Sequence, residues 1–246
     1  MKNHNLFYPA SLTAMSLMVI GVQCNSPQKS EKPSETVPVP LTAKHYYSGF
    51  PDAHDTYNAI SAASDGKIYY VLSSTKHDVG GQFYVYDPVT DQTKFIADLT
   101  EAVGEKEGKY IAQGKSHVEF YERDGKLYFS THVGYYVMID GTEWLPVNAP
   151  EGYQHYHGGH FLSYDMKTGK IESLALAHGE GILTMTMDKQ HGHLYGISWP
   201  NGYLLHYDLN TRQLKKLGLI DGSGESGAVG KDYRVLCRSM VVDPRD

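Results

Sequence analysis

Three segments of the chain repeat the same order of strand-forming and turn-forming residues. They span residues 59–99, 116–177 and 181–220, and each contains a strand, a tight turn, an aromatic strand, a variable loop, a third strand, a second turn and a last strand. The third strand ends in Tyr-Asp in every segment. This repeat limits the possible folds, because copies of one small unit must bury their apolar surfaces against one another.

The length and order of the repeat predict a β-propeller made of four-stranded antiparallel blades. Meanders of this kind, roughly 40 to 45 residues before insertions, are typical of propeller blades. Residues 238–246 resemble the first strand of a further unit that stops inside its hairpin turn. Since closed propellers have at least ~4 blades, we expect an all-β, C-terminally incomplete ring of about three blades plus the start of a fourth.

The N-terminus resembles an export signal followed by a tether. Lys2 supplies a short basic region, and the apolar residues 12–22 are too few to span a bilayer. Cys24 follows, as in bacterial lipoproteins whose cysteine is lipidated, although the residues before it depart from the usual pattern and leave ordinary cleavage or retention open. We therefore expect a signal in residues 1–24, a disordered polar linker in 25–44 and the partial propeller in 45–246.

Charge and cysteine content narrow the partners and the compartment. The net charge of −6 argues against nucleic acid as the main partner, because phosphate binding requires concentrated Lys and Arg. The predicted signal places the protein in the periplasm or on the cell surface, or otherwise outside the cell, with membrane contact only through a lipid anchor. Cys237 has no disulfide partner once Cys24 is assigned to the anchor; a buried structural thiol is the preferred interpretation and a metal ligand the alternative.

Residues 113–136 place one histidine at each open end of a predicted hairpin. His117 opens the first strand, His132 closes the second, and the chain reverses at Asp124-Gly125. In a four-stranded meander the variable loops and the joints between blades lie on the face opposite the short turns. Both histidines are expected on that face, where they are either functional groups or caps of backbone groups.

Other candidate residues belong to the same face. Arg238 begins an innermost strand, like His117, and is expected at the mouth of the channel. A buried unpaired arginine is costly, so Arg238 should either meet an acidic side chain or receive an anionic ligand. Trp199 ends a second strand, and Gln113 and His178 lie in joints between blades, so we expect these residues to contact a substrate.

A loop rich in histidine and tyrosine interrupts the second unit. His155, His157 and His160 have the spacing H-x-H-x-x-H, which would place two imidazoles on one side of a strand as ligands of a divalent metal such as zinc. A surface loop without metal is the alternative interpretation. The sequence contains no nucleotide-binding glycine loop, no G-x-S-x-G and no H-E-x-x-H motif.

The export signal, the repeated D-G-K-[IL]-Y and Y-D-x-x-T motifs, and the histidines and arginine of the rim resemble secreted bacterial propellers that act on polysaccharides. Within that group the chain looks most like the seven-bladed ulvan lyases. The likeness covers residues 57–246, but many inert propellers share the blade motifs, and the third unit departs from the first motif at Gly192-His193.

This resemblance implies an activity and a set of roles. His117 and His132 would act on the base side, Tyr195 as the acid and Arg238 as the group that neutralises a uronate carboxylate, while a zinc ion would be structural. The implied reaction is β-elimination on an anionic polysaccharide or oligosaccharide. A cell-surface protein that binds glycans without catalysis and a scaffold for protein partners are the alternatives.

Overall fold

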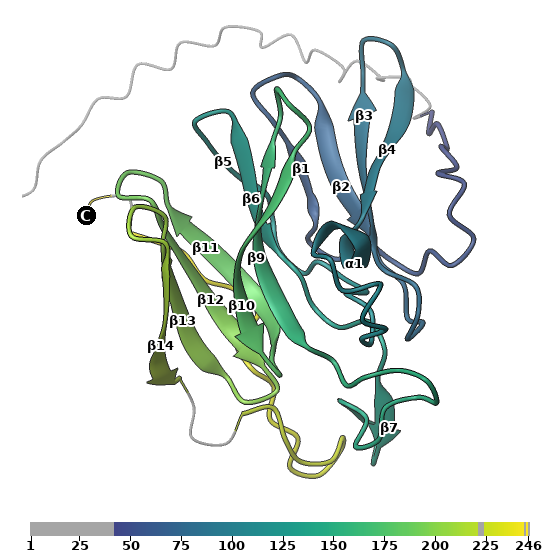
Figure 1. Ribbon diagram of the computed structural model, residues 1–246, viewed down its shortest axis with the longest axis vertical. Coiled ribbons are helices and arrows are strands. Elements are labelled where there is room, and N and C mark those ends of the chain that lie inside the picture. Colours follow the sequence, from purple (N-terminus) through teal and green to yellow (C-terminus); the bar gives the residue numbers. More distant parts are fainter. Residues whose placement is uncertain (1–41, 221–223, 244, 246) are drawn as a thin grey trace, which may run out of the picture. The chain divides into compact units, whose positions relative to one another are not determined.

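The computed structural model describes residues 42–220, 224–243 and 245 (Figure 1). The chain divides into two compact units, Met1–Lys44 and His45–Asp246. In the first unit only residues 42–44 are described, and they carry no regular secondary structure. The expectations for the export signal, Cys24 and nearly all of the linker therefore lie outside the described residues.

The first unit of the sequence repeat forms a four-stranded antiparallel sheet. Its strands are β1 (Ile60–Ala62), β2 (Ile68–Leu72), β3 (Gln82–Asp87) and β4 (Gln92–Asp98), and they pair in chain order. A one-turn helix, α1 (Leu99–Ala102), follows β4 directly. It starts there because the Asp98 carboxylate accepts hydrogen bonds from the first free backbone N–H groups.

The second and third units form two further sheets of the same kind. The second contains β5 (Tyr121–Arg123), β6 (Lys126–Ser130), β9 (Gly158–Asp165) and β10 (Ile171–His178), and the small hairpin of β7 (Val137–Ile139) and β8 (Thr142–Trp144) is inserted between β6 and β9. The third contains β11 (Gly181–Asp188), β12 (His193–Trp199), β13 (Tyr203–Asp208) and β14 (Gln213–Leu219). The repeat predicted from the sequence is confirmed.

The three sheets stand side by side in Figure 1. Aromatic side chains pack between them. Phe83 of the first sheet packs on Phe129 and Tyr164 of the second, with ring centroids 5.2 and 5.1 Å apart. Phe161 of the second sheet faces Tyr207 of the third at 6.3 Å. These contacts make the sheets blades of one all-β propeller whose ring is incomplete.

Two expectations about strand positions are wrong. The 113–136 hairpin does turn at Asp124-Gly125, where both residues have positive φ, but β5 begins only at Tyr121. His117 therefore precedes the strand, because the Phe120 N–H donates to the Ser61 hydroxyl at 3.1 Å instead of joining the ladder. Residues 238–243 form no strand either, since no described strand pairs with them.

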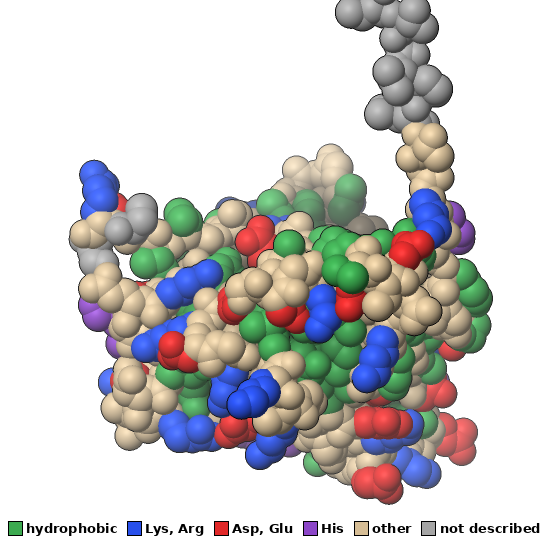
Figure 2. Space-filling view, turned by 90° about the horizontal axis from the view of Figure 1, so that it is seen from above, with side chains coloured by type: hydrophobic (Ala, Val, Ile, Leu, Met, Phe, Trp, Pro, Cys, Tyr) green, Lys and Arg blue, Asp and Glu red, His purple; other side chains and the backbone are tan. Residues whose placement is uncertain are grey.

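The face that carries the short turns is polar and mixed in charge. Figure 2 looks onto this side, where Lys and Arg side chains are interspersed with Asp and Glu around hydrophobic ones. No large area of one charge sign is visible there. Among the described residues, no helix has the length and apolar character required to cross a membrane.

Candidate functional site

A short backbone bridge on the opposite face brings the predicted histidine pair together. Lys115, before β5, and His132, after β6, exchange N–H to carbonyl hydrogen bonds of 2.9 and 2.8 Å. The bridge fixes the backbone at His132 and at Lys115, two residues before His117. The His117 ring meets the His132 ring edge to face, with centroids 4.7 Å apart. The structure thus places the two imidazoles in direct contact, although they come from opposite ends of the hairpin.

Both imidazoles are buried and each retains an unused ring nitrogen. His117 is 9% exposed and His132 is 2% exposed, and neither His117 Nε2 nor His132 Nδ1 has a hydrogen-bond partner among the described residues. Burial, with smaller contributions from the charges of Lys115 and Arg238, lowers the pKa of His117 to about 3. Burial and the neighbouring His117 and Lys115 also hold the pKa of His132 well below its usual value. Both rings are therefore neutral at physiological pH and have lone pairs available.

Gly181, the first residue of β11, makes room for His132. A β-carbon at this position would lie 2.0 Å from His132 Nδ1. On its other sides the His132 ring contacts Trp199 at a centroid distance of 5.4 Å, and Tyr136 packs on the same indole at 5.4 Å. Trp199, predicted to bind substrate, is buried and forms a wall of the histidine pair.

Lys115 is a member of this site that the sequence did not indicate. It is 2% exposed, and its Nζ lies 3.2 Å from the Tyr57 hydroxyl, 4.6 Å from the Tyr57 ring centroid and 5.0 Å from that of Tyr136. Tyr57 also stacks on His117 with centroids 4.2 Å apart. Nothing in the residue pattern marks this lysine as buried, because most lysines remain in solvent.

Arg238 is close to the pair but its charge is balanced. Its Nη2 lies 3.0 and 3.2 Å from the two carboxylate oxygens of Glu225, which is itself buried. Of the two expectations for Arg238, the structure therefore shows an acidic partner, supplied by the segment after β14. Arg238 and His117 also line a cavity of about 570 Å³, together with Asn58 and Thr184.

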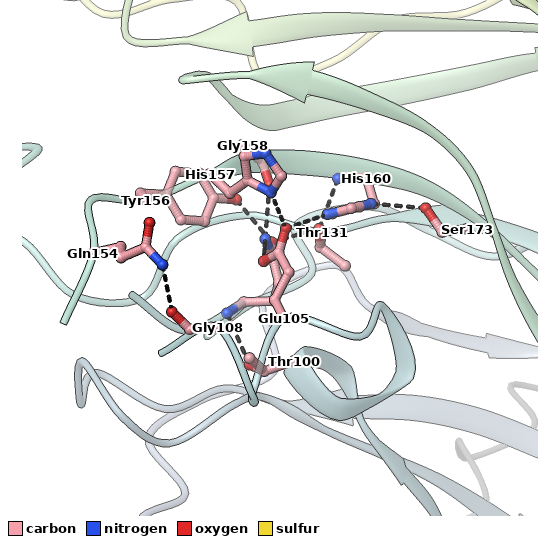
Figure 3. A network of polar contacts seen from close by, with 11 residues as sticks. Thr100, Glu105, Gly108, Thr131, Gln154, Tyr156, His157, Gly158, His160 and Ser173 are labelled. Carbon is pink, nitrogen blue, oxygen red and sulfur yellow. Dashed lines mark hydrogen bonds and ion pairs between the residues drawn. The ribbon is translucent and has the colours of Figure 1, made fainter. Parts of the chain in front are cut away.

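A buried polar network is centred on Glu105 (Figure 3). Glu105, three residues beyond the end of α1, accepts hydrogen bonds of 2.8 Å from His157 Nδ1 and His160 Nε2 on one carboxylate oxygen. Its other oxygen accepts a bond of 2.8 Å from the amide of Gln113. Burial alone would raise the pKa of Glu105, but the bonds from His160 and Gln113 outweigh it and lower the pKa.

Gln113 links this network to the backbone bridge. Its amide nitrogen also donates to the Gly158 carbonyl at 2.7 Å, and its amide oxygen accepts from Thr131 at 2.7 Å and Tyr156 at 2.8 Å. All its hydrogen-bonding atoms are thus used inside the protein. Gln113 lies two residues before Lys115 and Thr131 lies directly before His132, so the network positions the site. The sequence prediction of substrate contact did not include this role.

Of the three histidines predicted to bind metal, His157 and His160 meet on one oxygen of Glu105, and His155 lies apart. His155 is exposed, whereas His160 uses both ring nitrogens, one with Glu105 and one with the Ser173 hydroxyl at 2.7 Å. His178 is exposed and its ring lies 5.3 Å from that of His157. In the ranges 42–220, 224–243 and 245, no group of three His, Cys, Asp or Glu residues is arranged to hold a metal ion.

Two further residues lie away from the pair. Tyr195 is in the middle of β12, where it stacks on His206 with centroids 5.0 Å apart. Trp199, which does contact His132, lies four residues further along the same strand, roughly 13 Å away. Cys237 is exposed, so the expectation of a buried structural thiol is wrong. The described residues 224–243 form no strand that would bury its side chain.

No family model matches the sequence, and no curated protein is similar enough to count as a match. Among solved structures, TolB from Acinetobacter baumannii is 14% identical with a TM-score of 0.38, over 67% of this chain and 33% of that one. An auxiliary nutrient binding protein from Bacteroides thetaiotaomicron is 13% identical with a TM-score of 0.40, over 69% and 33%. An exo-1,5-alpha-L-arabinanase from a bovine ruminal metagenomic library is 15% identical with a TM-score of 0.35, over 68% and 53%. The chain thus spans between a third and about half of these proteins.

Proposed function

We propose that this chain carries the base side of an exported polysaccharide lyase, which cleaves a uronate-containing glycan by β-elimination. One observation carries the proposal: His117 and His132 are neutral, in contact, and each retains a buried ring nitrogen that has no partner among the residues that the structure describes. Buried polar atoms are normally hydrogen-bonded, and exceptions gather at functional sites. Of the two rings, that of His117 lines the cavity of about 570 Å³, where a base can reach a substrate proton, and His132 packs behind it.

The reaction assigns a role to each group. The proton next to the uronate carboxylate moves to a neutral imidazole, the electrons of the broken C–H bond form a carbon–carbon double bond, and the glycosidic C–O bond breaks. The departing oxygen takes a proton from an acid. We assign the role of this acid to Tyr57, because its ring stacks on His117 and its hydroxyl lies beside Lys115. Tyr195, the acid that the resemblance implies, lies in the middle of β12 against His206 and not beside the histidine pair.

Unsaturated products of this reaction absorb ultraviolet light, which gives a direct assay. The purified chain is incubated with a panel of uronate polymers, and the absorbance is followed in wild type, His117→Ala and His132→Ala. Loss of the base should lower the rate by about 10²- to 10⁴-fold. His191→Ala is the matched control, because this histidine is exposed in the turn between β11 and β12. If no uronate polymer yields an unsaturated product, the lyase proposal is wrong.

Glycan binding without catalysis is the second candidate. The Tyr57 ring, which is 47% exposed beside His117, offers an aromatic face on which a sugar ring can stack, while Tyr136 and Trp199 form the wall behind it. This candidate expects that His117→Ala retains most of its affinity for a glycan that the wild type binds but does not cleave. Location in the periplasm or at the cell surface belongs to both candidates and is tested by fractionation of cells that express the full chain.

A further inference from the structure

We propose that Lys115 is the centre of a buried anion site that receives the acidic group of a sugar. This inference rests on the proposed function, and it adds the residue that binds the acidic group of the sugar, a carboxylate or a sulfate. The argument starts from the surroundings of the ammonium group. Within the described residues no carboxylate forms an ion pair with Lys115, although the side chain is almost completely buried.

The contacts of Lys115 leave most of its bonding capacity unused. An ammonium has three N–H donors, and in the described part of the chain only the Tyr57 hydroxyl accepts one of them. The rings of Tyr57 and Tyr136 attract the charge through their π faces, but they accept no conventional hydrogen bond. A buried cation with free donors is unfavourable unless a partner of opposite charge completes the site.

No neighbouring group among the described residues supplies this partner, which leaves an anion from outside the site. The two imidazoles cannot balance the charge, because the positive charge of Lys115 helps to keep them neutral. Arg238 already has Glu225 as its partner, so its charge is matched within the protein. Lys115 therefore carries the unbalanced positive charge beside the pair, and an acidic group bound there would place the adjacent sugar carbon next to the imidazoles.

Tyr57 covers this site from the solvent side. Its side chain is partly buried against His117 and Lys115, yet the residue is 47% exposed. Its φ of 42° lies in the left-handed region, which is uncommon for a residue with a large side chain and often marks a functional position. An incoming sugar thus meets Tyr57 first, while Tyr136 and Trp199 form the inner wall of the site.

Binding of simple sugars to the full chain tests the site without requiring turnover. A Trp144→Phe background leaves Trp199, which touches His132, as the only tryptophan, since the sequence contains two. Glucuronate, glucose 6-sulfate and glucose are titrated while fluorescence is followed. We expect saturable binding of at least one anionic sugar and none of glucose, and the tighter of the two anions identifies the acidic group. Equal binding of glucose would overturn the proposal.

Lysine variants provide the decisive comparison. Lys115→Met should weaken anion binding at least tenfold, whereas Lys216→Met should bind like wild type. Lys216 is a matched control because its ammonium also lies over a tyrosine ring, that of Tyr203 at 3.9 Å, but on β14. Unchanged affinity in Lys115→Met would overturn the proposal.

Thermal stability separates an anion site from a structural lysine. Without a sugar, Lys115→Met should melt at a higher temperature than wild type, because it removes a buried charge that no carboxylate of the described residues balances. A lower melting temperature, or failure to fold, would show that the lysine is needed for the structure and would overturn the inference. If only the lyase proposal is wrong, the outcome differs: the anion still binds through Lys115, but no unsaturated product forms.

Discussion

The orientation of His132 depends on a neighbouring residue that has no side chain. Gly181→Ala would place a methyl group 2.0 Å from His132 Nδ1. The φ of Gly181 is not in the left-handed region, so backbone strain does not contribute. We expect the imidazole to be pushed from its place, with a loss of turnover approaching that of His132→Ala.

A double-variant cycle checks the cause. If the clash with the ring is the reason, Gly181→Ala should cost far less stability in a His132→Ala background than in wild type, because the smaller side chain leaves room for the methyl group. Stability is measured by urea unfolding of the four proteins. Additive effects would show that Gly181 is needed for another reason.

The buried histidine pair should make stability depend on pH. Unfolded histidine has a pKa of about 6.5, whereas His117 in the folded protein has a pKa of about 3 and that of His132 is also depressed. Below pH ~6.5 the unfolded chain therefore binds more protons than the folded one, so stability is fully present above that pH and is lost as the pH falls. Each ring contributes a slope of about 1.4 kcal/mol per pH unit.

Urea unfolding at pH 7 and pH 5 measures this slope. The two rings together should lower the free energy of unfolding by about 4 kcal/mol between these pH values, and His117→Asn should lose about half of that dependence. His191→Asn, at the exposed turn, should leave the slope close to that of wild type. A His117→Asn protein with the full wild-type slope would contradict the burial argument.

Residues 113–136 show how far the sequence predicts this site. The Asp-Gly turn correctly predicted that His117 and His132 lie at the same end of a hairpin. The pattern could not reveal Lys115, because the burial of a lysine depends on Tyr57 and Tyr136, which the fold brings over it. Glu105 was missed for the same reason, since its partners His157 and His160 lie 52 and 55 residues further along the chain.

At the scale of elements, the Glu105 network joins the end of α1 to β9. Glu105→Gln replaces one carboxylate oxygen by an NH₂ group. The remaining oxygen can still accept from the two histidines, but the NH₂ then faces the donating amide of Gln113. Gln113 cannot turn its amide around, because its oxygen is already bonded to Thr131 and Tyr156.

We therefore expect Glu105→Gln to lower the free energy of unfolding by about 2–4 kcal/mol, the range for a broken buried network. Glu101→Gln is the control, because the Glu101 pair with Lys106 is exposed on both sides and should change stability by less than about 1 kcal/mol. Urea unfolding at pH 7 compares both with wild type. Equal effects of the two variants would mean that the network does not stabilise the fold.

The turns that follow the third strands explain why the repeat was readable. The Asp of each Tyr-Asp pair accepts hydrogen bonds from backbone N–H groups two residues on: Asp87 from Val89 at 2.9 Å, Asp165 from Lys167 at 3.0 Å. This chemistry is local, so the sequence alone predicts it. The start of β5 was not predictable in this way, since the Ser61 hydroxyl that replaces a ladder bond belongs to another sheet.

At the scale of the whole molecule, the number of four-stranded sheets followed from the repeat, but the composition of the site did not. Tyr57 precedes β1, Lys115 lies between the first two sheets and Trp199 ends a strand of the third. They meet only because the sheets pack side by side through residues such as Phe83 and Phe161. A repeat predicts each blade from local contacts, whereas the site depends on contacts between blades.

The same stacking predicts self-association. Large apolar side chains remain exposed on strands of the first and last sheets: Ile60 and Phe95 are 51% and 48% exposed, and Leu217 and Leu219 on β14 are 54% and 48% exposed. Blade surfaces of this kind are normally covered by another sheet, and an edge strand with exposed apolar residues promotes pairing between chains. We therefore expect the purified chain to associate as its concentration rises.

Sedimentation velocity over a range of concentrations tests this expectation. Lys substitutions at Leu217 and Leu219 should shift the protein toward monomer, because a charge opposes burial of the strand in a contact between copies. Val89→Lys is the control, since Val89 is 92% exposed in the turn between β3 and β4 and lies on neither end strand. A wild-type protein that stays a monodisperse monomer and melts in one sharp transition would show that the exposed strands are tolerated in solution.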